Sequence, residues 1–113
     1  MTNKEKKNIL NEIVERLKKN INVKEIIIFG SYTNDSIKQD SDLDMLVILD
    51  EEGVVKNYKE KLERRRRVTS LLNDYRKRIS LDVLVYSSEE WEKLKLINSS
   101  LVKEINMNGM RIS

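Results

Sequence analysis

Three short runs of apolar, largely β-branched residues constrain the fold of this chain more than any other feature of its sequence. The run from Val23 to Phe29 ends in four consecutive large apolar residues and stops at Gly30, which predicts a buried strand. Residues 42–49 and 79–86 are also strand-like, because their side chains alternate with the period of two that a strand requires. We therefore expect a sheet built from these three segments.

Amphipathic helices are expected around the strands. Thr2 and Glu5 have the spacing of a capping box, ahead of an apolar periodicity that ends near Asn20. Residues 55–78 contain no Gly or Pro and predict one long helix. Ser87 with Glu90 predicts another capping box. The last helix is capped by Ser99 or Ser100 and stops at Gly109; its apolar positions are Leu101, Val102 and Ile105. This order predicts one mixed α/β (α+β) domain over residues 1–113, a small mixed β-sheet with helices packed on one face.

Composition excludes several kinds of chemistry. The chain of 113 residues has no Cys and no His, which removes thiolate nucleophiles, Ser-His catalysis, disulfides and the usual zinc sites. An enzyme of this composition must work with carboxylates, Lys, Arg, hydroxyls or a hard metal bound through oxygen. No apolar run approaches a membrane span and no signal peptide is seen, so we expect a cytoplasmic protein. The net charge of +3 permits an anionic ligand without arguing for nucleic acid.

Three aspartates occupy positions where a strand would ordinarily exclude them. Asp42 and Asp44 are two apart on one predicted strand, so both side chains leave the same face, where like charges repel. Asp82 stands among apolar residues of another strand, where it is costly unless paired or metal-bound. If these strands are neighbours, the three carboxylates form a Mg²⁺ site suited to phosphoryl chemistry. The alternative is that Asp42 and Asp44 are solvated turn residues.

A Gly-Ser turn strengthens the catalytic interpretation. Gly30 and Ser31 directly follow the first strand, where Gly permits a close backbone approach and Ser offers its hydroxyl and N–H to phosphate oxygens. Ten residues separate Ser31 from Asp42, which gives the pattern G-S-x₁₀-D-x-D. With this pattern, the chain resembles the minimal nucleotidyltransferases of the polymerase-β-like superfamily. The resemblance rests on residues 28–32, 40–47 and 81–86, and residues 99–112 are similar to the closing helix and short strand of these proteins.

The resemblance implies a polymerase-β-like nucleotidyltransferase fold and a role for each of the motif residues. Asp42 and Asp44 would hold the metal bound to the triphosphate of an NTP, which the resemblance implies is ATP. Asp82 would join them on a second Mg²⁺ and activate the acceptor hydroxyl, and Gly30 and Ser31 would hold the β- and γ-phosphates. The reaction would be in-line attack on the α-phosphate with release of pyrophosphate. The chain departs from the family at Asp35, where Gly is usual; Asp tolerates the left-handed conformation, but its charge repels phosphate.

The acceptor and the role of the arginine run remain open from sequence. Four consecutive arginines, residues 64–67, sweep around the long helix, and they form either a solvated face with one inward stem or a contact with triphosphate or a partner. The family resemblance implies a protein partner, a helical RNase toxin of HEPN type, which would receive AMP on a tyrosine and so be neutralised. Two alternatives are an antitoxin that acts by contact alone and a basic RNA-binding domain.

Overall fold

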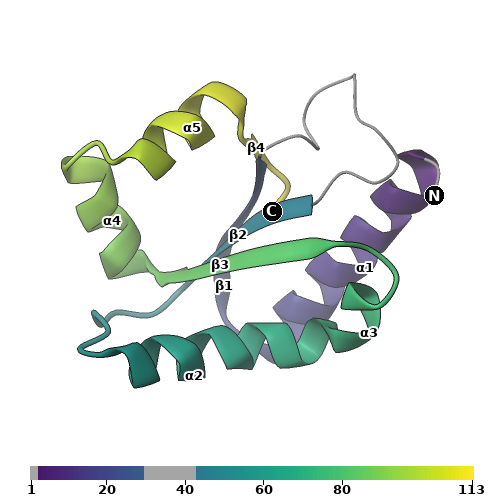
Figure 1. The fold of residues 1–113 in the computed structure, drawn as a ribbon, viewed down its shortest axis with the longest axis horizontal. Coiled ribbons are helices and arrows are strands. Elements are labelled where there is room, and N and C mark those ends of the chain that lie inside the picture. Colours follow the sequence, from purple (N-terminus) through teal and green to yellow (C-terminus); the bar gives the residue numbers. More distant parts are fainter. Residues whose placement is uncertain (1–2, 30–42) are drawn as a thin grey trace.

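The computed structural model describes residues 3–29 and 43–113, which form a four-stranded sheet with helices around it (Figure 1). The strands lie in the order β3-β2-β1-β4. Their bounds are β1 Val23–Phe29, β2 Leu43–Leu49, β3 Leu81–Ser87 and β4 Met110–Arg111. β2 and β3 are parallel, whereas β1 is antiparallel to both of its neighbours, β2 and β4. The three predicted strands are confirmed, and the two that carry aspartates are neighbours.

One face of the sheet is covered by the N-terminal and central helices. These are α1 (Asn3–Asn20), α2 (Tyr58–Thr69), a 3₁₀ helix (Ser70–Leu72) and α3 (Asn73–Arg76). Their apolar side chains pack against the residues of β1 and β2 that point to this side. The buried side chains of this layer include Ile9, Ile13 and Leu17 of α1, Ile26 and Ile28 of β1, Met45 and Val47 of β2, and Val68 and Leu72. None of the helices in the described ranges has both the length and the apolarity needed to span a bilayer.

The opposite face is covered as well, which corrects the prediction that the helices pack on one face only. α4 (Ser88–Leu96) and α5 (Ser100–Asn108) lie there, on the far side of the sheet from α1 and α2 (Figure 1). Their buried residues Trp91, Val102 and Ile105 pack against the alternate set of strand side chains. That set consists of Ile27 and Phe29 of β1 and Leu46 and Ile48 of β2. A strand with apolar side chains on both faces needs helices on both, because an uncovered face would leave its apolar side chains in solvent.

The single long helix predicted over residues 55–78 is also corrected. α2 begins only at Tyr58, because Asn57 adopts an extended conformation and its side chain accepts a hydrogen bond from the Glu60 N–H. The helix then tightens into the 3₁₀ turn before α3. Thr69, Leu72 and Tyr75 are all buried, and their spacing of three residues matches the period of a 3₁₀ helix. The 3₁₀ turn therefore allows all three side chains to pack toward the sheet.

The predicted helix ends near the C-terminus agree with the structure. Ser87 and Glu90 form the expected capping box at α4, and the Ser99 hydroxyl accepts from the Val102 N–H at α5. Gly109 is the C-terminal cap of α5 and adopts an extended conformation. The position favours glycine, because a Cβ there would lie 2.5 Å from the Ile105 carbonyl oxygen. The Thr2 cap lies outside the described residues.

Candidate active site

Asp44 and Asp82 are partners in the register of two neighbouring strands. Asp44 of β2 lies directly beside Asp82 of β3 in the parallel ladder. Since side chains alternate along a strand, both carboxylates leave the sheet on the face that carries Leu46 and Leu84, the face covered by α4 and α5. Asp44 is half-buried, and the side chain of Asp82 is 64% exposed. The fold therefore brings together two acids that are 38 positions apart in the sequence.

The local structure explains why these acids stand at the beginning of their strands. The Leu43 N–H donates to the Ser80 carbonyl at 2.8 Å, which aligns the starts of β2 and β3. Phe29, at the end of antiparallel β1, pairs with Asp44 on the other side. Figure 1 shows α4 beside the opposite end of β3, where the strand leads into this helix. The aspartates thus lie at the end of β3 away from α4.

The remaining predicted site residues lie outside the described part of the chain. These are Gly30, Ser31 and Asp42, together with Asp35 at the position where glycine is usual. Phe29 and Leu43, the described residues that flank this segment, both belong to the strands that carry or adjoin the aspartate pair. The roles of Gly30, Ser31 and Asp42 therefore stay predictions.

Arg65 is a component of the site that sequence reasoning did not single out from the arginine run. Its Nη2 lies 3.8 Å from the Asp82 Oδ1, and its Nε donates to the Val83 carbonyl at 3.2 Å. The guanidinium is thus held at the outer edge of β3, beside the carboxylate. The signal in the sequence was helical spacing: Arg65 is three residues from both Leu62 and Val68, which face inward to different degrees.

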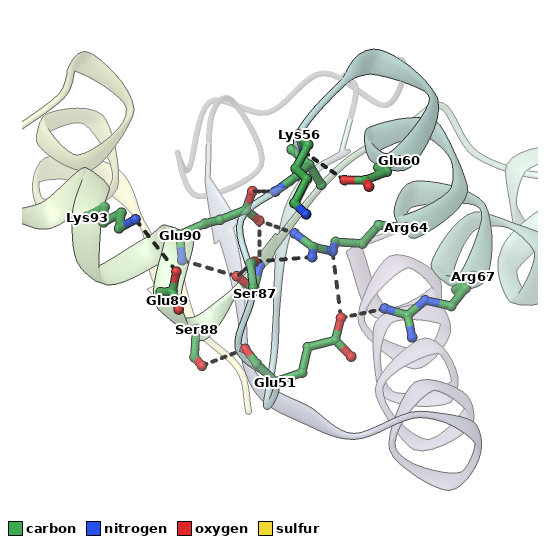
Figure 2. A network of polar contacts seen from close by, with 12 residues as sticks. Glu51, Lys56, Glu60, Arg64, Arg67, Ser87, Ser88, Glu89, Glu90 and Lys93 are labelled. Atoms are coloured by element: carbon green, nitrogen blue, oxygen red, sulfur yellow. Dashed lines mark hydrogen bonds and ion pairs between the residues drawn. The ribbon is translucent and has the colours of Figure 1, made fainter.

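Arg64 has a structural role. Its side chain is 14% exposed and forms an ion pair with Glu90 of α4, while its Nη2 donates to the Gly53 carbonyl at 3.2 Å (Figure 2). Glu90 in turn accepts from the N–H groups of Ser87 and Val55. The same group of contacts joins α2, α4 and the segment that follows β2. The inward arginine of the run therefore ties three parts of the chain together.

The last two arginines of the run, Arg66 and Arg67, are more exposed than Arg64. Arg67 forms an ion pair with Glu51 at 2.5 Å (Figure 2). Arg66 is exposed to solvent. Exposed ion pairs contribute little to stability. These two side chains therefore fit the first alternative for the run, a solvated helix face. The run as a whole thus has divided roles, and Arg65 alone of its members contacts an aspartate of the pair.

A groove of about 240 Å³ extends from Asp82 along β3 and is bounded on its other side by α2. Arg65 and Asp82 lie at one end, and Tyr58 and Tyr86 line it as well. Burial, with a further contribution from the negative charge of Glu90, raises the pKa of the Tyr86 phenol above its usual value. Tyr86 therefore remains a neutral side chain at physiological pH.

The donor chemistry of the aspartate pair fits a hard divalent cation. Mg²⁺ prefers carboxylate oxygens and substrate phosphates to nitrogen or sulfur ligands, and this chain has neither His nor Cys. Within residues 3–29 and 43–113 no three acidic side chains come together in a group that could hold a metal ion. Asp42, one residue before Leu43, is the predicted third carboxylate.

Solved structures of known proteins share the fold of this chain. Among solved structures, a toxin–antitoxin with AMP-PNP is similar with a TM-score of 0.56 and 20% identity, over 91% of this chain and 71% of that one. A mutant of the toxin–antitoxin MntA-HpeT with two aspartates replaced by glutamate has a TM-score of 0.55 and 18% identity, over 91% and 71%. A second mutant, with a tyrosine replaced by alanine, has a TM-score of 0.55 and 21% identity, over 91% and 70%. At these identities the likeness concerns the fold.

No curated protein sequence matches the chain. The sequence model of the family described as "Polymerase beta, Nucleotidyltransferase" does match, over residues 11–108. This range includes β1, β2, β3 and both aspartates of the pair. The chain therefore belongs to the polymerase beta nucleotidyltransferase family.

Proposed function

We propose that this chain is a Mg²⁺-dependent enzyme that transfers AMP from ATP to a hydroxyl group of a partner toxin, and that it acts as an antitoxin by doing so. The observation that carries the proposal is the register pairing of Asp44 and Asp82 on one face of the sheet. Two like charges side by side weaken a sheet, and a cation bound by both carboxylates would relieve that repulsion. Family membership supports nucleotidyl transfer as the chemistry.

Each residue of the site has a definite role in the proposed reaction. Asp42, Asp44 and Asp82 would hold up to two Mg²⁺ ions, which neutralise charge on the triphosphate and stabilise the negative charge that develops during transfer. Gly30 and Ser31 would hold the β- and γ-phosphates through backbone N–H groups and the Ser31 hydroxyl. Asp82, the more exposed acid of the pair, is available to accept the proton of the acceptor hydroxyl.

The bond changes of the proposed reaction balance. The acceptor oxygen forms a bond to the α-phosphorus, and the bond from that phosphorus to the bridging oxygen of the β-phosphate breaks. Pyrophosphate leaves with the bonding electrons, and the hydroxyl proton passes to Asp82. The product is an AMP phosphodiester on the acceptor side chain.

The choice of ATP and of a toxin as acceptor is supported by the similar structures. One of them is a toxin–antitoxin with AMP-PNP, an ATP analogue, and two others are mutants of the toxin–antitoxin MntA-HpeT. A helical RNase of HEPN type is the partner that the sequence resemblance implies. The exposed position of Asp82 is compatible with an acceptor as large as a protein.

The proposal is tested by binding and by labelling. We expect calorimetry to detect ATP binding that depends on Mg²⁺, and we expect incubation with labelled ATP to add AMP to a hydroxyl side chain of the toxin. Asp50→Asn is a suitable control, because Asp50 is an exposed acid that immediately follows β2. Equal ATP affinity with and without Mg²⁺ would contradict the metal site, and a bound toxin that gains no mass would contradict the transferase.

A further inference from the structure

The groove between α2 and β3 has two walls that match in length and run in opposite directions. On α2, Tyr58, Leu62 and Arg65 recur at the spacing that places side chains on one face of a helix. From Tyr58 to Arg65 the helix advances about 10 Å. On β3, Asp82 to Tyr86 spans about 13 Å. Arg65 contacts Asp82 at one end, so Tyr58 lies toward the Tyr86 end.

The two ends of this groove differ in chemistry. At one end, Arg65 is paired with Asp82, and Lys61 lies between Arg65 and Tyr58 along α2. Toward the other end, the walls are aromatic and aliphatic, with Tyr58 73% exposed to solvent. An aromatic side chain with this exposure, beside Tyr86 and Leu84, provides apolar contact area that the described part of the chain does not cover.

The groove also follows a free sheet edge. β3 is the terminal strand in the order β3-β2-β1-β4, so its outer edge has no partner strand within the described residues. The Val83 carbonyl points away from β2, since it accepts a hydrogen bond from Arg65 of α2. Arg65 already occupies the Val83 carbonyl, so an extended polypeptide would use backbone groups further along this edge, while the groove selects its side chains.

We propose that this groove binds an extended segment of the acceptor protein, with an apolar residue about four positions from the hydroxyl side chain and acidic residues between the two. The inference rests on the proposed function, because it takes Asp82 as the point where the hydroxyl is delivered. At 240 Å³ the groove is smaller than typical small-molecule pockets. This size suits a polypeptide segment that lies along the groove and inserts single side chains into it. Arg65 is paired with Asp82, so Lys61 is the cation of the lining that attracts an acidic side chain, at a position between the hydroxyl residue and the apolar residue.

The test uses two synthetic peptides labelled with a fluorophore. One carries a central tyrosine flanked by glutamates, with a leucine four positions away on either side; the other has lysines in place of the glutamates. Binding is measured by fluorescence anisotropy without ATP, and AMP transfer is measured separately with labelled ATP. The test variants are Lys61→Glu and Tyr58→Ala, both at exposed positions where the fold does not depend on the side chain. Their matched controls are Lys59→Glu, on the same helix outside the groove, and Leu96→Ala, an exposed apolar residue of α4.

We expect the wild-type chain to bind the acidic peptide at least about tenfold more tightly than the basic one, as an interfacial charge contact can provide. Lys61→Glu should reverse this preference and Tyr58→Ala should weaken binding of both peptides, whereas the two controls should behave as wild type. No binding, equal affinity for the two peptides, or equal losses in test and control variants would overturn the proposal. Tighter competition by a single-stranded RNA would show instead that the tyrosines and cations serve nucleic acid.

These outcomes separate the groove from the transferase. Peptide binding with the expected variant pattern but without AMP transfer contradicts the proposed function and leaves the docking site standing. Transfer to the toxin that is insensitive to both groove variants contradicts the docking site and leaves the transferase standing.

Discussion

At the scale of single residues, the informative positions are those where a side chain opposes its local structure. Asp44 and Asp82 are aspartates in strands, a poor choice for that backbone, and they stand side by side in the ladder. Alternation along each strand was enough to predict the face to which each one points. The spacing of Arg65 from Leu62 and Val68 did not single it out, because four arginines in succession sweep around the helix and the contact with Asp82 depends on how α2 crosses β3.

The two aspartates of the pair should differ when each is replaced. Asp82→Asn should lower AMP transfer by roughly 10² or more, since it removes the proposed proton acceptor, while much of the affinity for Mg²⁺ and ATP remains. Asp44→Asn should lose both transfer and binding, because Asp44 is expected to share with Asp42 the metal that accompanies the triphosphate. The measurements are ATP titration calorimetry and rates of toxin labelling, with circular dichroism to verify folding. Near-normal transfer by Asp82→Asn would remove it from the catalytic set.

At the scale of elements, periodicity predicted the strands well and the helices less well. Period two and period 3.6 are local signals, so the strands appeared where the side-chain pattern placed them. The long helix over residues 55–78 was wrong at its start and near its centre, where the Asn57 cap and the buried Thr69, Leu72 and Tyr75 decide the backbone. The Asn57 cap followed by Glu60 was visible in the sequence, whereas the 3₁₀ turn depends on how these side chains meet the sheet.

The ion pair between α2 and α4 leads to a prediction about stability. Arg64 and Glu90 are 14% and 11% exposed, so removing one charge leaves the other buried without its partner. We expect Arg64→Met to reduce the free energy of unfolding by about 3 kcal/mol. Urea denaturation measures this loss. Glu90→Gln added to Arg64→Met should recover part of it, because Gln keeps an acceptor for the Ser87 and Val55 N–H groups without a buried charge.

Arg66→Met is the matched control for that experiment, because Arg66 lies on the same helix and is exposed. Its effect should stay within about 0.5 kcal/mol, as for most surface substitutions. If Arg64→Met were no more destabilising than Arg66→Met, the contacts between α2 and α4 would contribute little to the fold.

At the scale of the whole molecule, the arrangement of the sheet was beyond the reach of local patterns. The pairing of β2 with β3 brings Asp44 to Asp82, yet it depends on a parallel crossover that no turn signal encodes. The cover on both faces could have been inferred from the unbroken apolar run in β1, since a strand exposed on one face would alternate. Spacing and family resemblance, by contrast, were sufficient to anticipate the nucleotidyltransferase family.

For the whole molecule, the question is whether it neutralises a toxin by covalent AMP transfer or by binding alone. If AMP transfer is the mechanism, an RNase partner treated with the wild-type chain, Mg²⁺ and ATP should stay inactive after the antitoxin has been removed, because a phosphodiester bond persists without the enzyme. An RNase treated with Asp82→Asn, or with wild type in the absence of ATP, should regain RNA cleavage on removal. Asp50→Asn should behave as wild type, since the exposed Asp50 lies outside the proposed site. RNA cleavage that returns equally after wild-type treatment would mean that inhibition lasts only as long as the complex, and the chain would then act as a binding antitoxin.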